Sequence, residues 1–331
     1  MTTSSGQALR VYQENGKVTA RLENVDLPVL DNGEVLIQSE YSSLNYKDAL
    51  AITGRGKILK SFPLIAGIDV AGKVFDTKDP KFAVGQKVLV TGCGLGESFD
   101  GGYSTWVKVS GEHVVPVPTP FSTYDVMALG TAGFTAGLCL ARMEANGQNP
   151  HKGPILVTGA SGGVGGIAVR LLASKGYEVM AVSSKPEARG SLIARGAQEV
   201  LSPSELNLGQ RPLESAKWAG AIDNLGGEFL SGIIPHIGLY GNVASVGLAS
   251  GHELNGTVMP FILRGVSLLG ISSANCPMKL RKEVWQDLAA TITPQQVAEF
   301  VSAEISLNNL PATSEKLLDR QIWGRTVVKL N

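Results

Sequence analysis

Residues 155–166 read Ile-Leu-Val-Thr-Gly-Ala-Ser-Gly-Gly-Val-Gly-Gly. A short apolar run breaks into glycines and then returns to apolar residues, which predicts a strand, a tight turn and a helix over 167–175. The first turn of a helix has unpaired N–H groups and the positive end of the helix dipole, and both favour a phosphate. The stretch therefore predicts a dinucleotide-binding turn, with a glycine spacing that is a variant of the strict G-x-G-x-x-G form.

The end of the next predicted strand, 178–183, indicates which dinucleotide fits. NAD-binding chains place Asp or Glu about twenty residues past the glycines, against the ribose 2′-hydroxyl. This chain has Ser183, Ser184 and Lys185 there. Arg189 follows about one helical turn later. Hydroxyls and cations suit a 2′-phosphate, so the sequence favours NADP(H) over NAD(H). The alternative is that Lys185 and Arg189 only form the solvated face of the next helix.

Composition excludes several classes of protein. With 331 residues, 44% of them hydrophobic and 18% charged, the chain is globular and long enough for two domains. Basic and acidic residues number 29 each, so the net charge of zero favours neither nucleic acid nor an anionic membrane. The three cysteines lie far apart and predict no disulfide framework. We see no leader and no apolar run of bilayer length, and we expect a soluble cytoplasmic protein.

Three zones follow one another along the chain. Residues 1–125 alternate short β runs with Gly and Pro, which is typical of an irregular β barrel. Residues 126–265 alternate strands and helices, which predicts a doubly wound parallel sheet. Residues 266–331 begin with a strand at 267–271 and end with a β run at 325–329. If that last run joins the barrel, the first domain is discontinuous (1–125 and 266–331) and the second (126–265) is inserted. The predicted fold class is α/β.

Strings along nearly the whole chain resemble the medium-chain dehydrogenase/reductase superfamily, and within it the zinc-free quinone oxidoreductase and NADPH-dependent acrylyl-CoA reductase branch. The strings are Ser42–Gly54, Gly67–Gly72, Gly130–Ala136, the 157–165 turn and Met259–Arg264. The resemblance implies a GroES-like (chaperonin-10-like) barrel domain and a Rossmann domain, with the nicotinamide in the cleft between them. It also implies a homodimer formed through the edge strand of the Rossmann sheet, residues 267–271.

The resemblance also implies positions for the cofactor. The pyrophosphate would meet Ser161, Gly162, Gly163 and Val164, and the adenosine phosphate would meet Ser183, Ser184, Lys185 and Arg189. The positions that match the ribose and nicotinamide sides are Tyr46, Asn224, Leu248, Ile262 and Ser273. Arg325 matches a terminal basic position that can reach the cofactor.

A metal is not expected. Catalytic zinc needs a thiolate, an imidazole and a third Cys or carboxylate. Zinc members of the superfamily have Gly-His-Glu where this chain has Gly67-Ile68-Asp69. The cysteine of their earlier loop is replaced in this chain by a residue of Leu44-Asn45-Tyr46. The four histidines have no ligand-like spacing. Alcohol oxidation that relies on zinc is therefore not expected.

NADPH without a Lewis acid suits a carbon that conjugation has already made electrophilic. A 2-enoyl thioester accepts hydride at Cβ, and the protein then needs donors at the carbonyl oxygen and a proton for Cα. Asn45 and Tyr46 are the catalytic candidates, because they offer an amide donor, an aromatic wall and a hydroxyl. Alternatively, Asn45 only holds a turn, Tyr46 only packs on the nicotinamide, and solvent supplies the proton. Asp48 is expected to orient the loop.

A basic stretch follows this segment and bears on the substrate. Arg55 and Lys57, with Lys60, could form a rim for the phosphates of coenzyme A, or an ordinary solvated loop. The leading hypothesis is an NADPH-dependent reductase that converts acrylyl-CoA or a similar short 2-enoyl-CoA to the saturated product, propionyl-CoA for acrylyl-CoA. The alternatives are an NADPH:quinone oxidoreductase and an NADPH-binding protein with little catalysis. The acceptor, the proton donor, the hydride face and any assembly beyond a dimer stay open.

Overall fold

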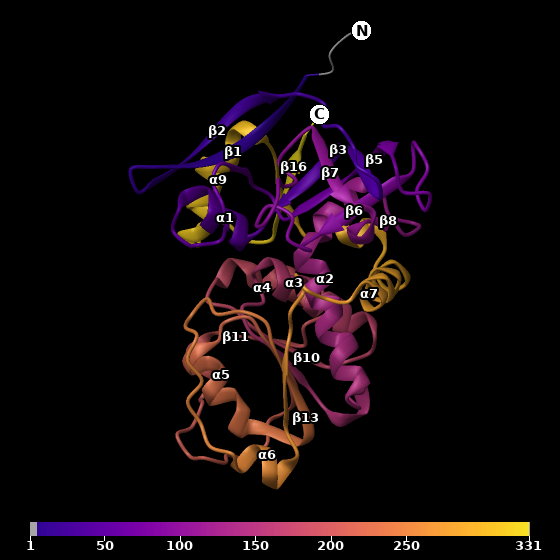
Figure 1. Ribbon diagram of the computed structural model, residues 1–331. Helices are drawn as coiled ribbons and strands as arrows, with labels where there is room; N and C mark the ends of the chain where they lie inside the picture. Colours follow the sequence, from indigo (N-terminus) through magenta and orange to yellow (C-terminus); the bar gives the residue numbers. More distant parts are fainter. Residues whose placement is uncertain (1–4, 331) are drawn as a thin grey trace. The chain divides into compact units, whose positions relative to one another are not determined.

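A computed structural model describes residues 5–330 and divides the chain into two compact units (Figure 1). Unit 1 comprises Met1–Thr131, Ala274–Ala289 and Thr293–Asn331. Unit 2 comprises Ala132–Ser273 and Ala290–Ile292. The chain therefore leaves unit 1 after its first 131 residues and returns to it at Ala274.

A six-stranded parallel sheet forms the centre of unit 2, in the order β11-β10-β9-β12-β13-β14. Its strands are β9 (Ile155–Val157), β10 (Val179–Val182), β11 (Glu199–Leu201), β12 (Trp218–Asp223), β13 (Ile237–Ser245) and β14 (Ser267–Gly270). Strands β9 and β12 are buried throughout, as expected for apolar runs in a sheet covered on both faces. The order of the strands reverses between β9 and β12, which is the Rossmann arrangement. The predicted α/β class is confirmed.

The helices of unit 2 connect these strands. They are α3 (Gly163–Ser174), α4 (Arg189–Ala194), α5 (Gly227–Ile233) and α6 (Met259–Arg264), with short 3-10 helices at Pro150–Lys152, Pro186–Ala188, Pro203–Leu206 and Ile234–His236. Helix α3 begins four residues earlier than the predicted 167. Glycines disfavour a helix by propensity, but a Cβ at Gly165 would lie 2.4 Å from Gly159 O. The helix can therefore rest directly on the turn only because glycine stands there.

Unit 1 consists mainly of β structure. One sheet has the order β15-β16-β3-β5-β6-β8, with β7 also pairing with β3, and a second has the order β2-β1-β4. The strands are β1 (Gly6–Glu14), β2 (Lys17–Val25), β3 (Glu34–Leu44), β4 (Leu64–Ile65), β5 (Asp69–Thr77), β6 (Lys87–Thr91), β7 (Trp106–Ser110), β8 (Val115–Pro116), β15 (Val301–Ser306) and β16 (Arg325–Lys329). The last strand, β16, pairs antiparallel with β3.

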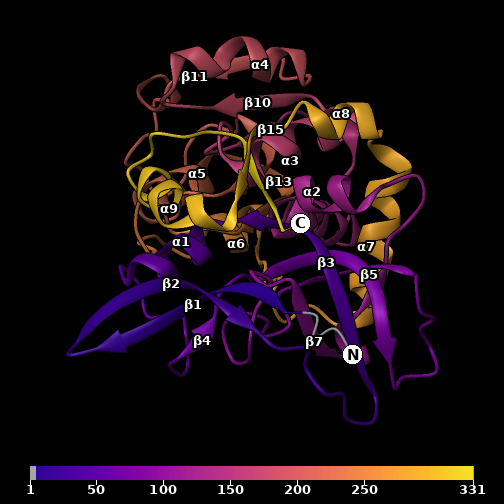
Figure 2. The same ribbon diagram turned by 90° about the horizontal axis from the view of Figure 1, so that it is seen from above.

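Short helices complete unit 1. They are α1 (Tyr46–Thr53), α8 (Pro294–Ala298) and α9 (Leu310–Leu318), with 3-10 helices at Gly111–His113 and Leu307–Asn309, while α7 (Met278–Thr291) has most of its length in this unit. The β1–β2 hairpin is long, and α1 and α9 lie side by side (Figures 1 and 2). A buried apolar cluster that includes Leu9, Val11, Ile52, Leu310 and Val328 holds the hairpin, both helices and β16 together.

Helix α2 (Thr123–Ala145) corrects one expectation. By length and composition it could cross a membrane, so the sequence does contain an apolar run of that size. However, 83% of its apolar window is buried inside the structure, as in the core helix of a globular protein. Gly130 interrupts the helix with φ 52° and ψ −156°. The interruption brings the backbone of α2 close to the polar cluster described below.

Candidate functional site

The turn after β9 presents backbone N–H groups at the N-terminus of α3. Gly159 has φ 59°, and the Gly162 N–H donates to Gly159 O at 2.9 Å, which closes the turn. The Ala160 N–H donates to Val182 O at 2.9 Å and so joins the turn to the end of β10. The predicted pyrophosphate residues lie together here and are all at least partly exposed: Ser161, Gly162, Gly163 and Val164. This geometry suits an anion.

The end of β10 lies next to that turn and carries the residues predicted for the adenosine phosphate. Ser183 is nearly buried, and its Oγ accepts the Lys185 N–H at 3.1 Å. Ser184 is exposed and Lys185 is half-buried. Arg189 begins α4, and its Nη1 donates to Val200 O at 2.6 Å. The structure thus brings hydroxyls and cations to one place, which suits a phosphate monoester.

Asn224 follows β12 at the reversal of strand order, where dinucleotides bind in open α/β sheets. Its Nδ2 donates to Thr158 O at 2.7 Å, and its backbone N–H donates to Thr158 Oγ1 at 2.9 Å. Within residues 5–330, its Oδ1 is buried and has no hydrogen-bond partner. A buried acceptor without a partner is rare and needs an explanation. A donor on a bound ligand would provide one.

The remaining predicted cofactor residues of unit 2 divide by the end of the sheet they occupy. Leu248 follows β13 and Ser273 follows β14, so both lie at the carboxyl edge with the phosphate turn. Ile262 does not, although it is 72% exposed. Its helix, α6, is held at the amino edge, because Arg264 Nη1 donates to Pro235 O at 2.9 Å and to Ile237 O at 3.0 Å. Within one chain, the structure separates Ile262 from the phosphate turn.

Unit 1 contains a buried cluster of polar side chains around Asp69. Ser43 Oγ donates to Asp69 Oδ2 at 2.6 Å, and Asn45 Nδ2 donates to the same oxygen at 2.9 Å. Thr131 donates its N–H to Asp69 Oδ2 at 2.8 Å and its hydroxyl to Asp69 Oδ1 at 2.5 Å. A Cβ at Gly130 would lie 2.7 Å from Asp69 Oδ2, so glycine is needed for this approach. We refer to Ser43, Asn45, Asp48, Asp69, Tyr103, Thr131 and Arg325 as the Asp69 cluster.

Asn45 connects the two carboxylates of the cluster. It caps α1, where its N–H donates to Asp48 Oδ2 at 2.9 Å and its Nδ2 reaches the same atom at 3.1 Å. Its Oδ1 accepts Arg325 Nη1 at 3.3 Å. Both ends of the amide are therefore bonded to buried groups. This arrangement corresponds to the alternative in which Asn45 holds a turn.

Arg325 lies inside unit 1 and is only 3% exposed. Its Nε donates to Ala128 O at 3.0 Å, and its Nη1 approaches Leu44 O at 3.4 Å. Burial lowers the pKa of Arg325, while Asp69 and Asp48 raise it. Within the described part of the chain, its Nη2 has no hydrogen-bond partner. The Arg325 guanidinium, which the resemblance brings to a cofactor, thus faces the Asp69 cluster.

Protonation decides the charge of this cluster. Burial and the neighbouring Asp69 raise the pKa of Asp48 to about 7, although the N–H groups of Ile68 and Asn45 act against that shift. Burial also raises the pKa of Tyr103 well above its ordinary value, and its hydroxyl donates to Ser43 O at 3.0 Å. With Asp48 protonated, one carboxylate balances one guanidinium. With Asp48 ionised, the buried cluster carries a net negative charge.

Tyr46 is the more exposed of the two catalytic candidates. It is the first residue of α1 and is 49% exposed, whereas Asn45 is 8% exposed. The basic residues of the next loop are arranged differently from the prediction. Arg55 Nη1 pairs with Asp319 Oδ1 at 2.8 Å and Glu315 Oε2 at 3.3 Å, both on or next to α9. Lys57 is exposed. Two acidic side chains thus offset the charge of Arg55, one residue of the expected basic rim.

Most of the Asp69 cluster was not predicted from the sequence. The sequence marks Asp69 only as a residue that stands where zinc members have a ligand, and it does not mark Tyr103 or Thr131 as site residues. The available signal was a carboxylate next to the apolar residues Val70 and Ala71, since a charge in a buried strand needs partners. The positions of those partners are not local in sequence.

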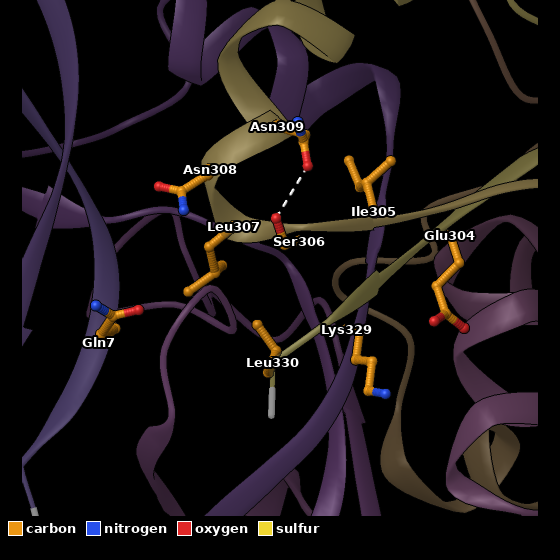
Figure 3. A pocket seen from close by; sticks show the side chains of 9 residues that line it. All are labelled: Gln7, Glu304, Ile305, Ser306, Leu307, Asn308, Asn309, Lys329 and Leu330. Atoms are coloured by element: carbon orange, nitrogen blue, oxygen red, sulfur yellow. Dashed lines mark hydrogen bonds between the residues drawn. The ribbon is translucent and has the colours of Figure 1, made fainter.

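Two hollows on the surface of unit 1 lie apart from Asn45 and Tyr46. One, of about 450 Å³, is shown in Figure 3 and is lined by Gln7, Glu304, Ile305, Ser306, Leu307, Asn308, Asn309, Lys329 and Leu330. The other, of about 780 Å³, runs between the end of β2 and β7. Neither hollow includes a residue predicted for cofactor or substrate.

Comparison with known proteins agrees with this geometry. Two family models match the chain: "Alcohol dehydrogenase GroES-like domain" over residues 31–119 and "Zinc-binding dehydrogenase" over residues 163–292. The chain is 45% identical over 325 residues to "Probable acrylyl-CoA reductase AcuI" of Escherichia coli, which covers 98% of this chain and 100% of the relative. It is 43% identical over 325 residues to "Putative quinone oxidoreductase YhfP" of Bacillus subtilis, with 98% of each chain covered.

Solved structures show the same likeness. The yhdH oxidoreductase of Salmonella enterica in complex with NADP superposes with a TM-score of 0.94 at 44% identity, covering 98% of this chain and 100% of that one. Bacillus subtilis protein yhfP with NAD bound superposes with a TM-score of 0.95 at 42% identity, covering 99% and 100%. The GroES-like and Rossmann parts of the predicted fold class are thereby confirmed.

Proposed function

The chain belongs to the medium-chain dehydrogenase/reductase superfamily and is an oxidoreductase, and from that premise we propose that it reduces the C=C bond of a short 2-enoyl-CoA with NADPH. Acrylyl-CoA is the favoured substrate and propionyl-CoA the product. The observation that carries this proposal is the 45% identity to an acrylyl-CoA reductase along the full length of both chains. A likeness of that extent includes both units.

The residues of unit 2 fit NADP(H). The exposed N-terminus of α3 offers N–H groups to the pyrophosphate, and Asn224 Oδ1 is a buried acceptor without a partner among the described residues. Ser183, Ser184 and Lys185 supply hydroxyls and a cation for the 2′-phosphate, and no carboxylate stands at these three positions to repel it. When bound, NADPH supplies the hydride. The part of this chain is to fix where that cofactor lies.

Unit 1 supplies the polar environment on the substrate side. The Asp69 cluster fixes the loop at Asn45 and the start of α1, and so it fixes the exposed ring of Tyr46. We propose that Tyr46 contacts the reactants, while Asn45 and Arg325 act as positioning residues. Hydride addition at Cβ of the thioester leaves negative charge on the carbonyl oxygen, and a proton then reaches Cα. Either the Tyr46 hydroxyl or solvent delivers that proton.

The donor set of the chain does not fit zinc. Within residues 5–330, no group of three or more His, Cys, Asp or Glu side chains is placed to hold a metal ion. Asp48 and Asp69 come together, but Arg325 approaches the same cluster, and a cation is a poor neighbour for a metal. The description of the matching family model thus differs from the side chains present here. No step of the proposed reaction uses a metal.

The assembly and location of the protein are also proposals. Among the described strands, β14 pairs only with β13 and leaves one edge of the sheet open. Leu239, Tyr240 and Leu263 are exposed on neighbouring elements. These features support a homodimer through β14. Size-exclusion chromatography with light scattering should give twice the mass of one chain, and the mass of a single chain would overturn the proposed dimer. Cys93, Cys139 and Cys276 form no disulfide with one another, which supports the reducing cytoplasm.

The test is steady-state reduction followed by the loss of NADPH absorbance. We expect turnover with acrylyl-CoA and NADPH, and a kcat/KM with NADH at least tenfold lower. Tyr46→Ala should lower kcat/KM by more than about tenfold. Tyr46→Phe keeps the ring and separates the two proton sources: activity near that of the wild type assigns the proton to solvent, and a loss close to that of Tyr46→Ala assigns it to the Tyr46 hydroxyl. Tyr12→Phe, which removes a hydroxyl from the hairpin of unit 1, is the matched control. Equal activity of Tyr46→Ala and the wild type would contradict the role of Tyr46.

The second candidate is an NADPH:quinone oxidoreductase, and the 43% identity to the Bacillus subtilis protein favours it. A quinone needs enclosure and stacking but fewer directed donors. Turnover with benzoquinone and none with acrylyl-CoA would replace the first proposal by this one. NADPH binding without turnover of any enoyl-CoA, enone or quinone would indicate a binding protein.

A further inference from the structure

Three polar residues meet where β9 and β12 end, and two of them have no assigned role. Thr158 follows β9, Asp223 ends β12, and Asn224 follows Asp223. Thr158 Oγ1 donates to Asp223 Oδ1 at 2.7 Å and accepts the Asn224 N–H at 2.9 Å. Thr158 O accepts Asn224 Nδ2 at 2.7 Å. One threonine thus contacts a carboxylate, a backbone amide and a side-chain amide.

We propose that Thr158 and Asp223 form a latch that orients the Asn224 amide, so that Asn224 Oδ1 accepts a hydrogen bond from a donor group of the bound dinucleotide. The inference rests on the proposed function and adds to it two positioning residues and the chemical class of the group they select. The term latch refers below to Thr158 and Asp223 only.

The orientation of the amide follows from the chemistry of its neighbour. A backbone carbonyl only accepts hydrogen bonds, so the side of Asn224 that faces Thr158 O must be the NH2 group. The opposite atom, Oδ1, is therefore left as an acceptor that is buried and without a partner among the described residues. An acceptor selects a hydroxyl or an N–H and disfavours a phosphate oxygen. The ribose hydroxyls and the carboxamide of a nicotinamide dinucleotide belong to the first class.

Asp223, the second residue of the latch, is itself fixed by its neighbours. It is fully buried, and besides Thr158 its carboxylate accepts the Gly226 N–H at 2.7 Å. Its backbone oxygen accepts the Val246 N–H at 2.9 Å, which joins the end of β13 to the same corner. A Cβ at Gly247 would lie 2.2 Å from Asn224 O, so the loop after β13 runs close to the Asn224 backbone. Contacts from the ends of β9, β12 and β13 therefore meet at Asn224, and its side chain is held by the hydrogen bond to Thr158 O.

A purely structural role predicts something different. Buried hydrogen bonds that only support the fold would affect stability when removed, but not ligand affinity once the protein is folded. If the latch acts through Asn224, removing a latch residue should weaken NADPH binding in a protein that has Asn224 and not in one that lacks it. Non-additive effects of this kind identify residues that work through one another.

The experiment compares NADPH dissociation constants of full-length variants by fluorescence titration. Thr158→Val keeps the volume and removes the hydroxyl, and we expect about tenfold weaker binding, the order of one or two hydrogen bonds. Thr158→Ser restores a hydroxyl and should bind within about twofold of the wild type. In an Asn224→Ala background, Thr158→Val should have little further effect. Tyr177→Phe is the matched control, because it removes a buried hydroxyl that donates to Glu144 Oε1 at 3.2 Å, at the other end of α3.

The outcomes separate the latch from the proposed function. Unchanged affinity in Thr158→Val, or an equal loss with and without Asn224, would overturn the latch and leave the reductase intact. Wild type that binds NADPH but does not turn over acrylyl-CoA would overturn the proposed substrate and leave the latch testable. A wild type that fails to bind NADPH would overturn both. If Thr158→Val does not fold, Asp223→Asn in the two backgrounds provides the same comparison.

Discussion

Replacing Asp48 by Asn should change how the stability of unit 1 depends on pH. Burial and Asp69 raise the pKa of Asp48 from 3.8 to about 7. A pKa difference of one between the folded and unfolded states corresponds to about 1.4 kcal/mol, so the ionised side chain costs about 4 kcal/mol in the folded protein. Because the folded pKa is the higher one, the native state holds an extra proton between these values. The contribution of Asp48 is therefore lost as the pH rises toward 7.

The measurement is the free energy of unfolding in urea between pH 5 and 8, for the wild type and Asp48→Asn. Two histidines, His113 and His236, have pKa values lowered by burial and change stability in the opposite direction. Their contributions cancel when the two proteins are subtracted. The difference should move by about 2 kcal/mol between pH 5 and 7 in favour of the variant, and then level off toward pH 8. A difference that stays constant across this range would refute an Asp48 that is protonated below neutrality.

Three further predictions concern other parts of the molecule. Lys185→Glu should raise the Kd for NADPH by about 10- to 100-fold and change the Kd for NADH much less, since the variant puts a carboxylate at the proposed 2′-phosphate position. Titration with both cofactors gives the two Kd values, and equal changes in them would contradict this role of Lys185. Gly130→Ala should lower the free energy of unfolding by at least about 1–3 kcal/mol, because its Cβ would lie 2.6 Å from Ser43 Oγ and φ is 52°; an unchanged thermal midpoint would be inconsistent with that contact. Arg55→Ala should change the KM for acrylyl-CoA by less than about threefold, because Asp319 and Glu315 already balance the charge of Arg55. A tenfold rise in KM would support the hypothesis that Arg55 binds the phosphates of coenzyme A.

The nucleotide side of the protein could be predicted because its signals are local. The turn, the following helix and the residues Ser183 to Lys185 all lie within about thirty residues of one βαβ unit. Even there, the predicted helix start was too late, since propensity counts Gly163 and Gly165 against a helix. Helix propensity is a property of single residues and does not include the close approach of Gly165 to the turn. The glycine that weakens the helical pattern at 165 is the one that lets the helix lie against the turn.

The Asp69 cluster could not be predicted in the same way. Asn45 and Asp69 are 24 residues apart, and Asn45 and Arg325 are 280 apart. Their meeting depends on the antiparallel pairing of β16 with β3, which places Thr326 opposite Leu44. The sequence showed that the last β run needs a partner but not which register it adopts. A register shift of one residue would turn Arg325 to the other face of the sheet and leave the two carboxylates without their cation.

Asn45 shows how a residue of suitable chemistry can be committed elsewhere. An enolate oxygen needs a donor, and the Asn45 amide has two N–H bonds, but these already serve Asp69 at 2.9 Å and Asp48 at 3.1 Å. To turn toward a substrate, the amide would have to leave buried carboxylate oxygens and release its contact with Arg325, at a cost of about 1–3 kcal/mol for each charged partner. Asn45 contributes instead by fixing the first turn of α1. Under the proposed function, the groups of this segment that meet the substrate would be exposed ones, and Tyr46 is 49% exposed whereas Asn45 is buried.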